Sequence, residues 1–169
     1  MLKSLVVFTV AGLVAFWVYS KNSVEFTLTE DTPIITETSP PCLQMYYLIE
    51  KYAEEYDIPK SYAYGIAYCE TRYHDPFQWK YNHKQTSCVG AVGPMQIMYT
   101  TAQYMWPDKK FTKEDLKSNI EFNVETSMKL LRHLHDKYGD WKLVFGCYNT
   151  GRPMVNQYAL NVYNYKIPF

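Results

Sequence analysis

Residues 64–73 read YGIAYCETRY and predict the last turns of a helix that Pro59 opens. Apolar residues recur in it at helical spacing, so one face of this helix is expected to pack on a core. Glu70 follows Ile66 by four residues and Ala67 by three, which places its carboxylate on that apolar face. Poor solvation raises the pKa of a carboxylate toward the range in which it donates a proton near neutral pH. Glu70 is therefore a candidate catalytic acid, and an ion pair at a helix end is the alternative.

Helical periodicity continues through most of the chain beyond residue 42. We expect helices over 43–56, 59 to about 74, 94–105, 120–138, 141–148 and 158–162, with a polar loop before Gly93. Thr112, with Asp115 three residues later, predicts a capped helical turn, and Gly139 suits the C-terminal end of the long helix. The chain has no internal repeat and no alternation of strands with helices. The sequence therefore predicts an all-α domain.

The N-terminal part of the chain differs from this domain in composition. Residues 2–19 are almost wholly apolar, with Lys3 near their start and Lys21 just after them, which predicts a cleavable signal peptide or a short membrane anchor over residues 1–20. Residues 21–41 are rich in Thr, Ser, Pro and Glu and predict a flexible linker. We expect residues 42–169 to form the folded domain and to be exported, with the membrane as partner of the N-terminal segment.

Charge and cysteine content limit the possible partners. The 17 Lys and Arg residues balance 17 Asp and Glu residues, which argues against nucleic acid as a partner. In an oxidising compartment, four cysteines permit disulfides in three pairings of Cys42, Cys69, Cys88 and Cys147. Free buried thiols are the alternative for Cys69 and Cys147. His133 and His135 are two residues apart on a predicted helix and do not share a face, so we expect no metal and no other cofactor.

Three further segments carry residue types that suit a ligand site. Residues 87–97 read SCVGAVGPMQI, in which glycines let the backbone approach a ligand and Gln96 offers an amide. Residues 146–151 read GCYNTG and present Tyr148 and Asn149 just before a glycine. The C-terminal part is rich in tyrosine, at Tyr158, Tyr163 and Tyr165. Each segment alone is a weak signal, because a glycine-rich turn is usually only a turn.

In this order and spacing, the segments resemble the soluble lytic transglycosylase domain, a relative of goose-type lysozyme. That family shows Glu-Ser, then Ser-x-x-Gly-Ala-x-Gly-Leu-Met-Gln, then a helix with Asn-Ile, and finally Ala-Tyr-Asn-x-Gly. The matching residues are Glu70-Thr71, residues 87–96, Asn119-Ile120 and residues 147–151. The departures are Thr71 for Ser, Pro94 for Leu and Cys147 for Ala. The resemblance covers about residues 43–163 and implies a lysozyme-like helical domain with a substrate cleft.

The resemblance also implies a chemistry, the cleavage of peptidoglycan between N-acetylmuramic acid and N-acetylglucosamine. Glu70 would protonate the glycosidic oxygen and then act as base on the muramic acid C6 hydroxyl, giving a 1,6-anhydro product without water. One carboxylate suffices, because the 2-acetamido group of the substrate replaces a protein nucleophile. The implied substrate-binding residues are Ser87, Met95, Gln96, Tyr148 and Asn149. For Ser87 and Asn149 a turn-stabilising role is the alternative.

Two other functions compete with this interpretation. A hydrolytic lysozyme of the same fold would use water in place of the C6 hydroxyl, and its product would be heavier by one water. A non-catalytic wall-binding protein would have no need for Glu70. We expect peptidoglycan glycan strands as the substrate, a location on the periplasmic side of a bacterial membrane, and a secretion apparatus, a conjugation system or a virion as the assembly served.

Overall fold

The computed structural model describes the backbone of residues 5–10, 13–20, 23–25 and 35–169, and the chain divides into two compact units, residues 1–36 and 37–169. In the first unit, three strands pair antiparallel in the order β1 (Leu5–Val10), β2 (Leu13–Ser20), β3 (Ser23–Glu25). No helix among the described residues is long and apolar enough to span a membrane. The signal peptide or anchor over 1–20 and the linker over 21–41 include residues outside the described ones, and both stay predictions.

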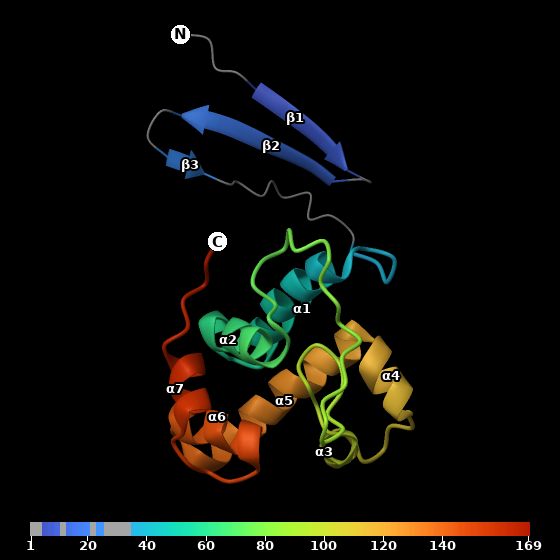
Figure 1. The fold of residues 1–169 in the computed structure, drawn as a ribbon, viewed down its shortest axis with the longest axis vertical. Coiled ribbons are helices and arrows are strands. Elements are labelled where there is room, and N and C mark those ends of the chain that lie inside the picture. Colours follow the sequence, from blue (N-terminus) through green and yellow to red (C-terminus); the bar gives the residue numbers. More distant parts are fainter. Residues whose placement is uncertain (1–4, 11–12, 21–22, 26–34) are drawn as a thin grey trace. The chain divides into compact units, whose positions relative to one another are not determined.

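The second unit is all-α, as predicted. Its helices are α1 (Pro41–Glu55), α2 (Lys60–Thr71), α3 (Tyr99–Met105), α4 (Lys113–Ser118), α5 (Ile120–Tyr138), α6 (Trp141–Thr150) and α7 (Gln157–Tyr163). The long helix α5 runs diagonally through this unit and contacts α1, α3, α4 and α6 (Figure 1). Helix α7 packs against both α6 and α2, so the C-terminal part of the chain returns to the helix that carries Glu70.

Helix α2 ends within one residue of Glu70, which is earlier than the predicted end near His74. Arg72 adopts a left-handed conformation with φ of 61°, and its N–H bonds the carbonyl of Tyr68 at 3.0 Å. A left-handed residue cannot continue a helix, so the chain turns away at this point. Inside α2, Ile66 and Ala67 are fully buried, which confirms the predicted apolar face.

The predicted helix over 94–105 is wrong in its first part. Helix α3 begins only at Tyr99, and residues 92–97 form a tight turn. Val92 and Ile97 exchange both backbone hydrogen bonds at 3.0 Å, and the N–H of Gln96 bonds the carbonyl of Gly93 at 3.2 Å. Gly93 and Gln96 have φ of 79° and 50°, and two left-handed residues exclude a helix here.

The predicted caps are confirmed. Thr112 and Asp115 form a reciprocal capping box at the start of α4, and Gly139 ends α5 with φ of 70°. Asn119 caps α5, because its side chain accepts a hydrogen bond from the N–H of Phe122 at 2.8 Å. These local signals set the start of α4 and both ends of α5.

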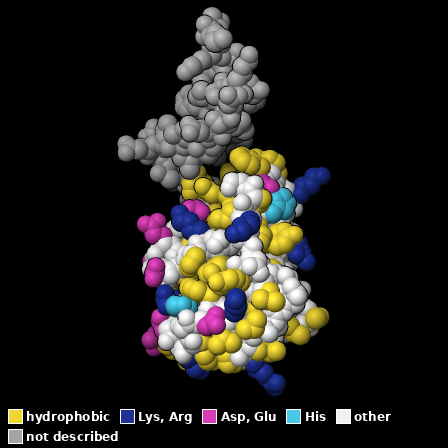
Figure 2. Space-filling model, turned by 90° about the vertical axis from the view of Figure 1, so that its left-hand side faces the viewer, with side chains coloured by type: hydrophobic (Ala, Val, Ile, Leu, Met, Phe, Trp, Pro, Cys, Tyr) yellow, Lys and Arg dark blue, Asp and Glu magenta, His cyan; other side chains and the backbone are white. Residues whose placement is uncertain are grey.

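The core of the helical unit lies among α1, α2, α5 and α6. Its largest fully buried side chains include Met45, Ile49, Tyr64, Ile66, Met128, Leu131 and Phe145. Figure 2 shows one face of the molecule, on which Lys and Arg alternate with Asp and Glu and hydrophobic side chains lie between them. That face has no extended surface of a single charge sign. All four cysteines are free thiols, so no disulfide contributes to the fold described.

Candidate active site

Glu70 lies on the last turn of α2, and its half-buried carboxylate faces α7. The hydroxyl of Tyr158, on α7, donates a hydrogen bond to Glu70 Oε1 at 2.5 Å. Burial raises the pKa of Glu70, and the hydrogen bond from Tyr158 lowers it by a smaller amount. The result is a carboxyl group whose pKa lies above its ordinary value and whose position is fixed by a second helix.

Tyr148 lies next to Glu70 and is fixed by two other parts of the fold. Its hydroxyl, on α6, donates to the carbonyl oxygen of Met95 at 2.7 Å and lies 2.9 Å from Ser127 Oγ on α5. Burial raises the pKa of Tyr148 well above its ordinary value, and the charge of Glu70 adds to this effect. The phenol therefore stays protonated at neutral pH.

Gly146 explains how α6 and α7 come together behind these tyrosines. A Cβ at this position would lie 1.6 Å from the carbonyl oxygen of Met154 in the chain that leads to α7. No side chain fits at that distance, so a glycine is required for the close approach. The glycine that opens the GCYNTG segment thus allows the returning chain to bring Tyr158 to Glu70.

The turn over 92–97 is fastened to α5 by Asn123, which is fully buried. The Asn123 side chain accepts from the N–H of Met95 at 2.8 Å and donates to the carbonyls of Val92 at 3.0 Å and Leu116 at 2.9 Å. Sequence reasoning missed this residue and matched Asn119 to the family's Asn-Ile motif instead. An asparagine on the predicted apolar face of α5, one turn after Asn119, was the signal that could have found it.

Thr71 fastens the same turn to α2. Its buried hydroxyl donates to the carbonyl oxygen of Pro94 at 2.7 Å and lies 2.7 Å from the hydroxyl of Tyr81. Thr71 stands where the family has a serine and keeps the hydroxyl group. This hydroxyl connects Thr71, directly after Glu70, to Pro94, directly before Met95. This contact keeps the helix end and the turn at a constant separation.

The remaining predicted site residues have structural contacts of their own. Met95 is fully buried, and its carbonyl is the group that holds Tyr148. Gln96 Nε2 donates to the carbonyls of Gly93 at 2.8 Å and Gln85 at 3.4 Å, inside the turn. The structure thus brings the Met95–Gln96 turn together with Glu70 and Tyr148.

Ser87 and Asn149 make the turn-stabilising contacts that were the alternative to substrate binding. Ser87 Oγ accepts from the N–H of Ala91 at 3.0 Å. Asn149 is exposed, and its side-chain oxygen accepts from Asn156 Nδ2 at 3.2 Å, between the end of α6 and the start of α7. Substrate contact by either residue stays a prediction.

Glu70 is the single carboxylate of this site among the described residues. Among residues 35–169, burial and Tyr158 account for the shift in the pKa of Glu70, and no second carboxylate contributes to it. The described residues also contain no group of three or more His, Cys, Asp or Glu side chains that could hold a metal ion. This site combines one protonatable carboxyl group with two phenols that stay protonated, an arrangement suited to proton transfer.

Residues 47–168, nearly the whole helical unit, match the Transglycosylase SLT domain family. The chain belongs to this family. Among solved structures, the 70 kDa soluble lytic transglycosylase from Escherichia coli is similar to this SLT domain, with a TM-score of 0.55 and 27% identity over 70% of this chain and 18% of that chain. The same values hold for the complex of the 70 kDa soluble lytic transglycosylase with bulgecin A.

A second relative shares the fold of this SLT domain. An inactive mutant of lytic transglycosylase Slt from Pseudomonas aeruginosa has a TM-score of 0.52 and 20% identity, over 63% of this chain and 16% of that chain. The chain therefore spans less than a fifth of the length of these relatives. No curated protein matches it. The predicted lysozyme-like helical fold is confirmed.

Proposed function

We propose that this protein is a peptidoglycan lytic transglycosylase that cleaves the β-1,4 bond between N-acetylmuramic acid and N-acetylglucosamine and forms 1,6-anhydro-N-acetylmuramic acid. The observation that carries the proposal is Glu70, a half-buried carboxyl group with a raised pKa, held by Tyr158 in an SLT domain. Peptidoglycan is the substrate class that the family and its lytic transglycosylase neighbours support.

In the first step, Glu70 acts as the general acid. Its proton passes to the glycosidic oxygen as the bond from that oxygen to C1 of the muramic acid breaks. A raised pKa keeps a larger fraction of Glu70 protonated near neutral pH, which this step requires. The hydrogen bond from Tyr158 then stabilises the carboxylate that remains.

The nucleophile that attacks C1 in this step comes from the substrate. A retaining enzyme with a protein nucleophile places two carboxyl groups about 5 Å apart. In the described residues no second carboxylate perturbs Glu70, which favours attack on C1 by the carbonyl oxygen of the 2-acetamido group. The Glu70 carboxylate next accepts the proton of the C6 hydroxyl, and O6 displaces the acetamido oxygen at C1 to close the anhydro ring.

The residues around Glu70 have supporting roles in this scheme. Tyr148 and Gln96 position the sugar at the Glu70 carboxyl group. The carbonyl oxygen of Met95 holds Tyr148 in place by accepting a hydrogen bond from its hydroxyl. Ser87 contacts an N-acetyl group in addition to closing its own turn. Asn149 is placed at the margin of the site, where its contact with Asn156 orders the end of α6.

We also place the protein outside the cytoplasm, at the peptidoglycan layer, with residues 1–20 as signal peptide or anchor. This location follows from the substrate and from the apolar run over 2–19. We further propose that the protein opens the wall locally for a larger assembly, such as a secretion apparatus, a conjugation system or a virion.

The test is turnover of purified peptidoglycan by the full-length protein and by Glu70→Gln. We expect release of soluble muropeptides to fall about 100-fold or more in Glu70→Gln, the effect of losing a general acid. Glu125→Gln is the matched control, because Glu125 is also half-buried with a pKa raised by burial, and it also accepts from a tyrosine, Tyr56. Equal loss in both variants, or no loss in Glu70→Gln, would contradict the proposal.

A further inference from the structure

The loop that follows α2 exposes two neighbouring aromatic side chains. Phe77 is 55% exposed and Trp79 is 56% exposed, and their ring centroids lie 6.3 Å apart. We call residues 77–80 the aromatic tip. None of these residues belongs to the site around Glu70. Single apolar residues are common on protein surfaces, whereas adjacent large ones mark an interaction surface.

The structure of the loop imposes this exposure. Tyr73 and Tyr81 are buried at its two ends, with their ring centroids 5.2 Å apart. Between them, Asp75 Oδ1 accepts from the N–H of Phe77 at 2.6 Å, and the N–H of Trp79 donates to the carbonyl of Phe77 at 2.9 Å. The tip therefore presents both rings in one arrangement, and a partner can bind them without first ordering the loop.

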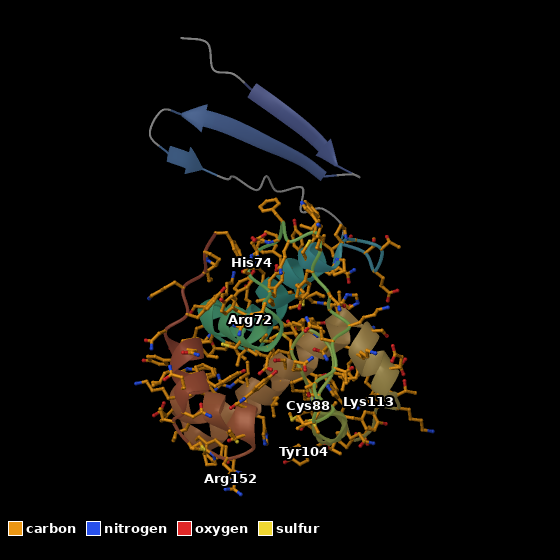
Figure 3. The ribbon with its side chains drawn as sticks, viewed as in Figure 1. Arg72, His74, Cys88, Tyr104, Lys113 and Arg152 are labelled. Carbon is orange, nitrogen blue, oxygen red and sulfur yellow. The ribbon has the colours of Figure 1, made fainter. Side chains whose placement is uncertain are left out.

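The chain enters the helical unit next to this loop. The hydroxyl of Tyr73 donates to the carbonyl oxygen of Cys42, the second residue of α1, at 2.9 Å. The side chain of Gln78, in the tip, accepts from the N–H of His74 at 3.2 Å. Figure 3 shows His74 at one end of the helical unit and Arg152, just beyond α6, near the other end. The start of α1 and the aromatic tip thus share an end of the unit.

This position matters because an apolar run, residues 2–19, precedes α1. If residues 1–20 are a membrane anchor, the bilayer is tethered to the helical unit at the end that carries the tip. The predicted linker over residues 21–36, when flexible, averages on the order of 20–25 Å in length. A domain of the size of residues 37–169 is roughly 35 Å across. The tether is therefore short enough to keep this end of the domain close to the bilayer.

The charge of the loop suits an anionic surface. From Arg72 to Lys84 the loop carries three exposed cations, of which Lys80 belongs to the tip, and one carboxylate, Asp75. That carboxylate pairs with the neighbouring histidine. In the whole chain, 17 Lys and Arg residues balance 17 Asp and Glu residues, so the excess of cations is local to the loop. Tryptophan beside lysine is typical of protein segments that lie among lipid headgroups.

The arrangement of the two rings also favours lipid over sugar. Their planes meet at 66°, so the rings form a wedge and not one flat face on which a sugar ring could stack. A wedge of apolar edges next to a lysine can enter the headgroup region, where the apolar part is buried and the ammonium contacts phosphate.

We infer that the aromatic tip docks the domain on a lipid bilayer that contains anionic lipid, with Phe77 and Trp79 among the headgroups and Lys80 on lipid phosphate. Docking keeps the end of the domain that carries Arg152 directed away from the bilayer. The inference goes beyond the proposed function, because it requires no chemistry at Glu70, and it rests only on the proposed location at a membrane.

The experiment uses full-length protein labelled with fluorotryptophan, in nanodiscs of phosphatidylcholine with one quarter phosphatidylglycerol. Each fluorine NMR signal is assigned by replacing one tryptophan at a time. A nitroxide on the lipid headgroup broadens the signals of groups at the membrane surface. We expect strong broadening at Trp79 and little at Trp106 and Trp141. These two are internal controls, because Trp106 bonds Thr126 on α5 and Trp141 stacks on His135.

The charge of the tip is tested by Lys80→Gln. This variant should lower the ratio of docked to free tip about fivefold, the effect of one lysine at an anionic surface. Lys113→Gln is the matched control, because Lys113 is also exposed and Figure 3 shows it well away from His74. It should dock as the parent does. If Lys80→Gln fails to fold, high salt tests the same contribution in the parent and should lower the ratio.

Three results would overturn the inference. The first is a Trp79 signal that the labelled lipid broadens no more than it broadens those of Trp106 and Trp141. The second is equal docking on phosphatidylcholine alone, which would refute the contact with anionic lipid. The third is a Trp79 signal that shifts with a soluble N-acetylglucosamine oligomer and does not respond to lipid, which would make the tip a sugar site. None of these readouts depends on cleavage, so failure of the proposed function is recognised separately, by the Glu70→Gln comparison on peptidoglycan.

Discussion

Replacing Tyr158 by phenylalanine removes one hydroxyl and keeps the ring that packs between α7 and α2. The hydroxyl donates to Glu70 Oε1 at 2.5 Å, and this bond favours the ionised carboxylate. Its loss therefore raises the pKa of Glu70 further above its ordinary value. The direction of this change is determined, because burial raises the pKa of Glu70 and the hydrogen bond from Tyr158 is the interaction that lowers it.

The size of the change follows from the strength of the bond. A hydrogen bond to a charged group contributes about 1.5–3 kcal/mol, and 1.36 kcal/mol corresponds to roughly one pKa unit. Glu70 is half-buried, so solvent screens part of this interaction and the lower end of the range applies. We therefore expect the pKa of Glu70 to rise by about one unit in Tyr158→Phe.

The assay is the pH dependence of kcat/KM for muropeptide release. The general acid must be protonated in the free enzyme, so the alkaline limb of the profile reports the pKa of Glu70. We expect this limb to move upward by about one pH unit in Tyr158→Phe. Tyr56→Phe is the control, because Tyr56 donates to Glu125 at 3.5 Å and makes no bond to Glu70. A limb that stays in place or moves downward in Tyr158→Phe would refute the assignment of Tyr158.

Three further predictions concern stability. Gly146→Ala should destabilise the fold by at least about 3 kcal/mol in denaturant unfolding, because its Cβ would lie 1.6 Å from the Met154 carbonyl oxygen and the backbone would have to move. Thr71→Val should cost about 1–3 kcal/mol by leaving the Pro94 carbonyl unpaired, and Thr71→Ser should recover most of it. The pKa of Glu70 is raised in the fold. The contribution of Glu70 to stability is therefore fully present at low pH, where the carboxyl group is protonated, and is lost as the pH rises through the pKa of the folded protein. Glu70→Gln should therefore gain thermal stability relative to wild type as the pH rises from about 4, the ordinary range of a glutamate, through the raised pKa of Glu70 in the fold, and a constant difference would contradict the shift.

Much of the helical unit could be predicted because its signals are local. The capping box at Thr112 and Asp115, the glycine at 139 and the apolar spacing in α2 each act within a few residues. The same spacing placed Glu70 on a buried face. Local sequence determines these features, since helix ends and faces depend on neighbouring residues.

The turn at 92–97 could not be predicted, because distant residues hold it. Gln96 has φ of 50°, a conformation that a non-glycine residue adopts only when its surroundings impose it. Here Asn123 on α5 and Thr71 on α2 bond the backbone at Met95 and Pro94. A pattern read along the chain instead suggests a helix begun by the proline.

The partner of Glu70 lies equally far away in sequence. Tyr158 is 88 residues from Glu70, and the contact exists only because α7 packs on α2. The sequence marked Tyr158 as one of several C-terminal tyrosines but offered no reason to choose it. The resemblance to a known motif, by contrast, predicts Tyr148 as a site residue, because a motif match carries information about contacts that local patterns lack.

The central claim is tested most directly by the mass of the muropeptides that full-length protein releases from purified peptidoglycan. The account predicts products with a 1,6-anhydro end, each lighter by one water than the hydrolysed form, and their absence in Glu70→Gln. Products with a free reducing end, still dependent on Glu70, would contradict the anhydro-forming step and indicate a lysozyme.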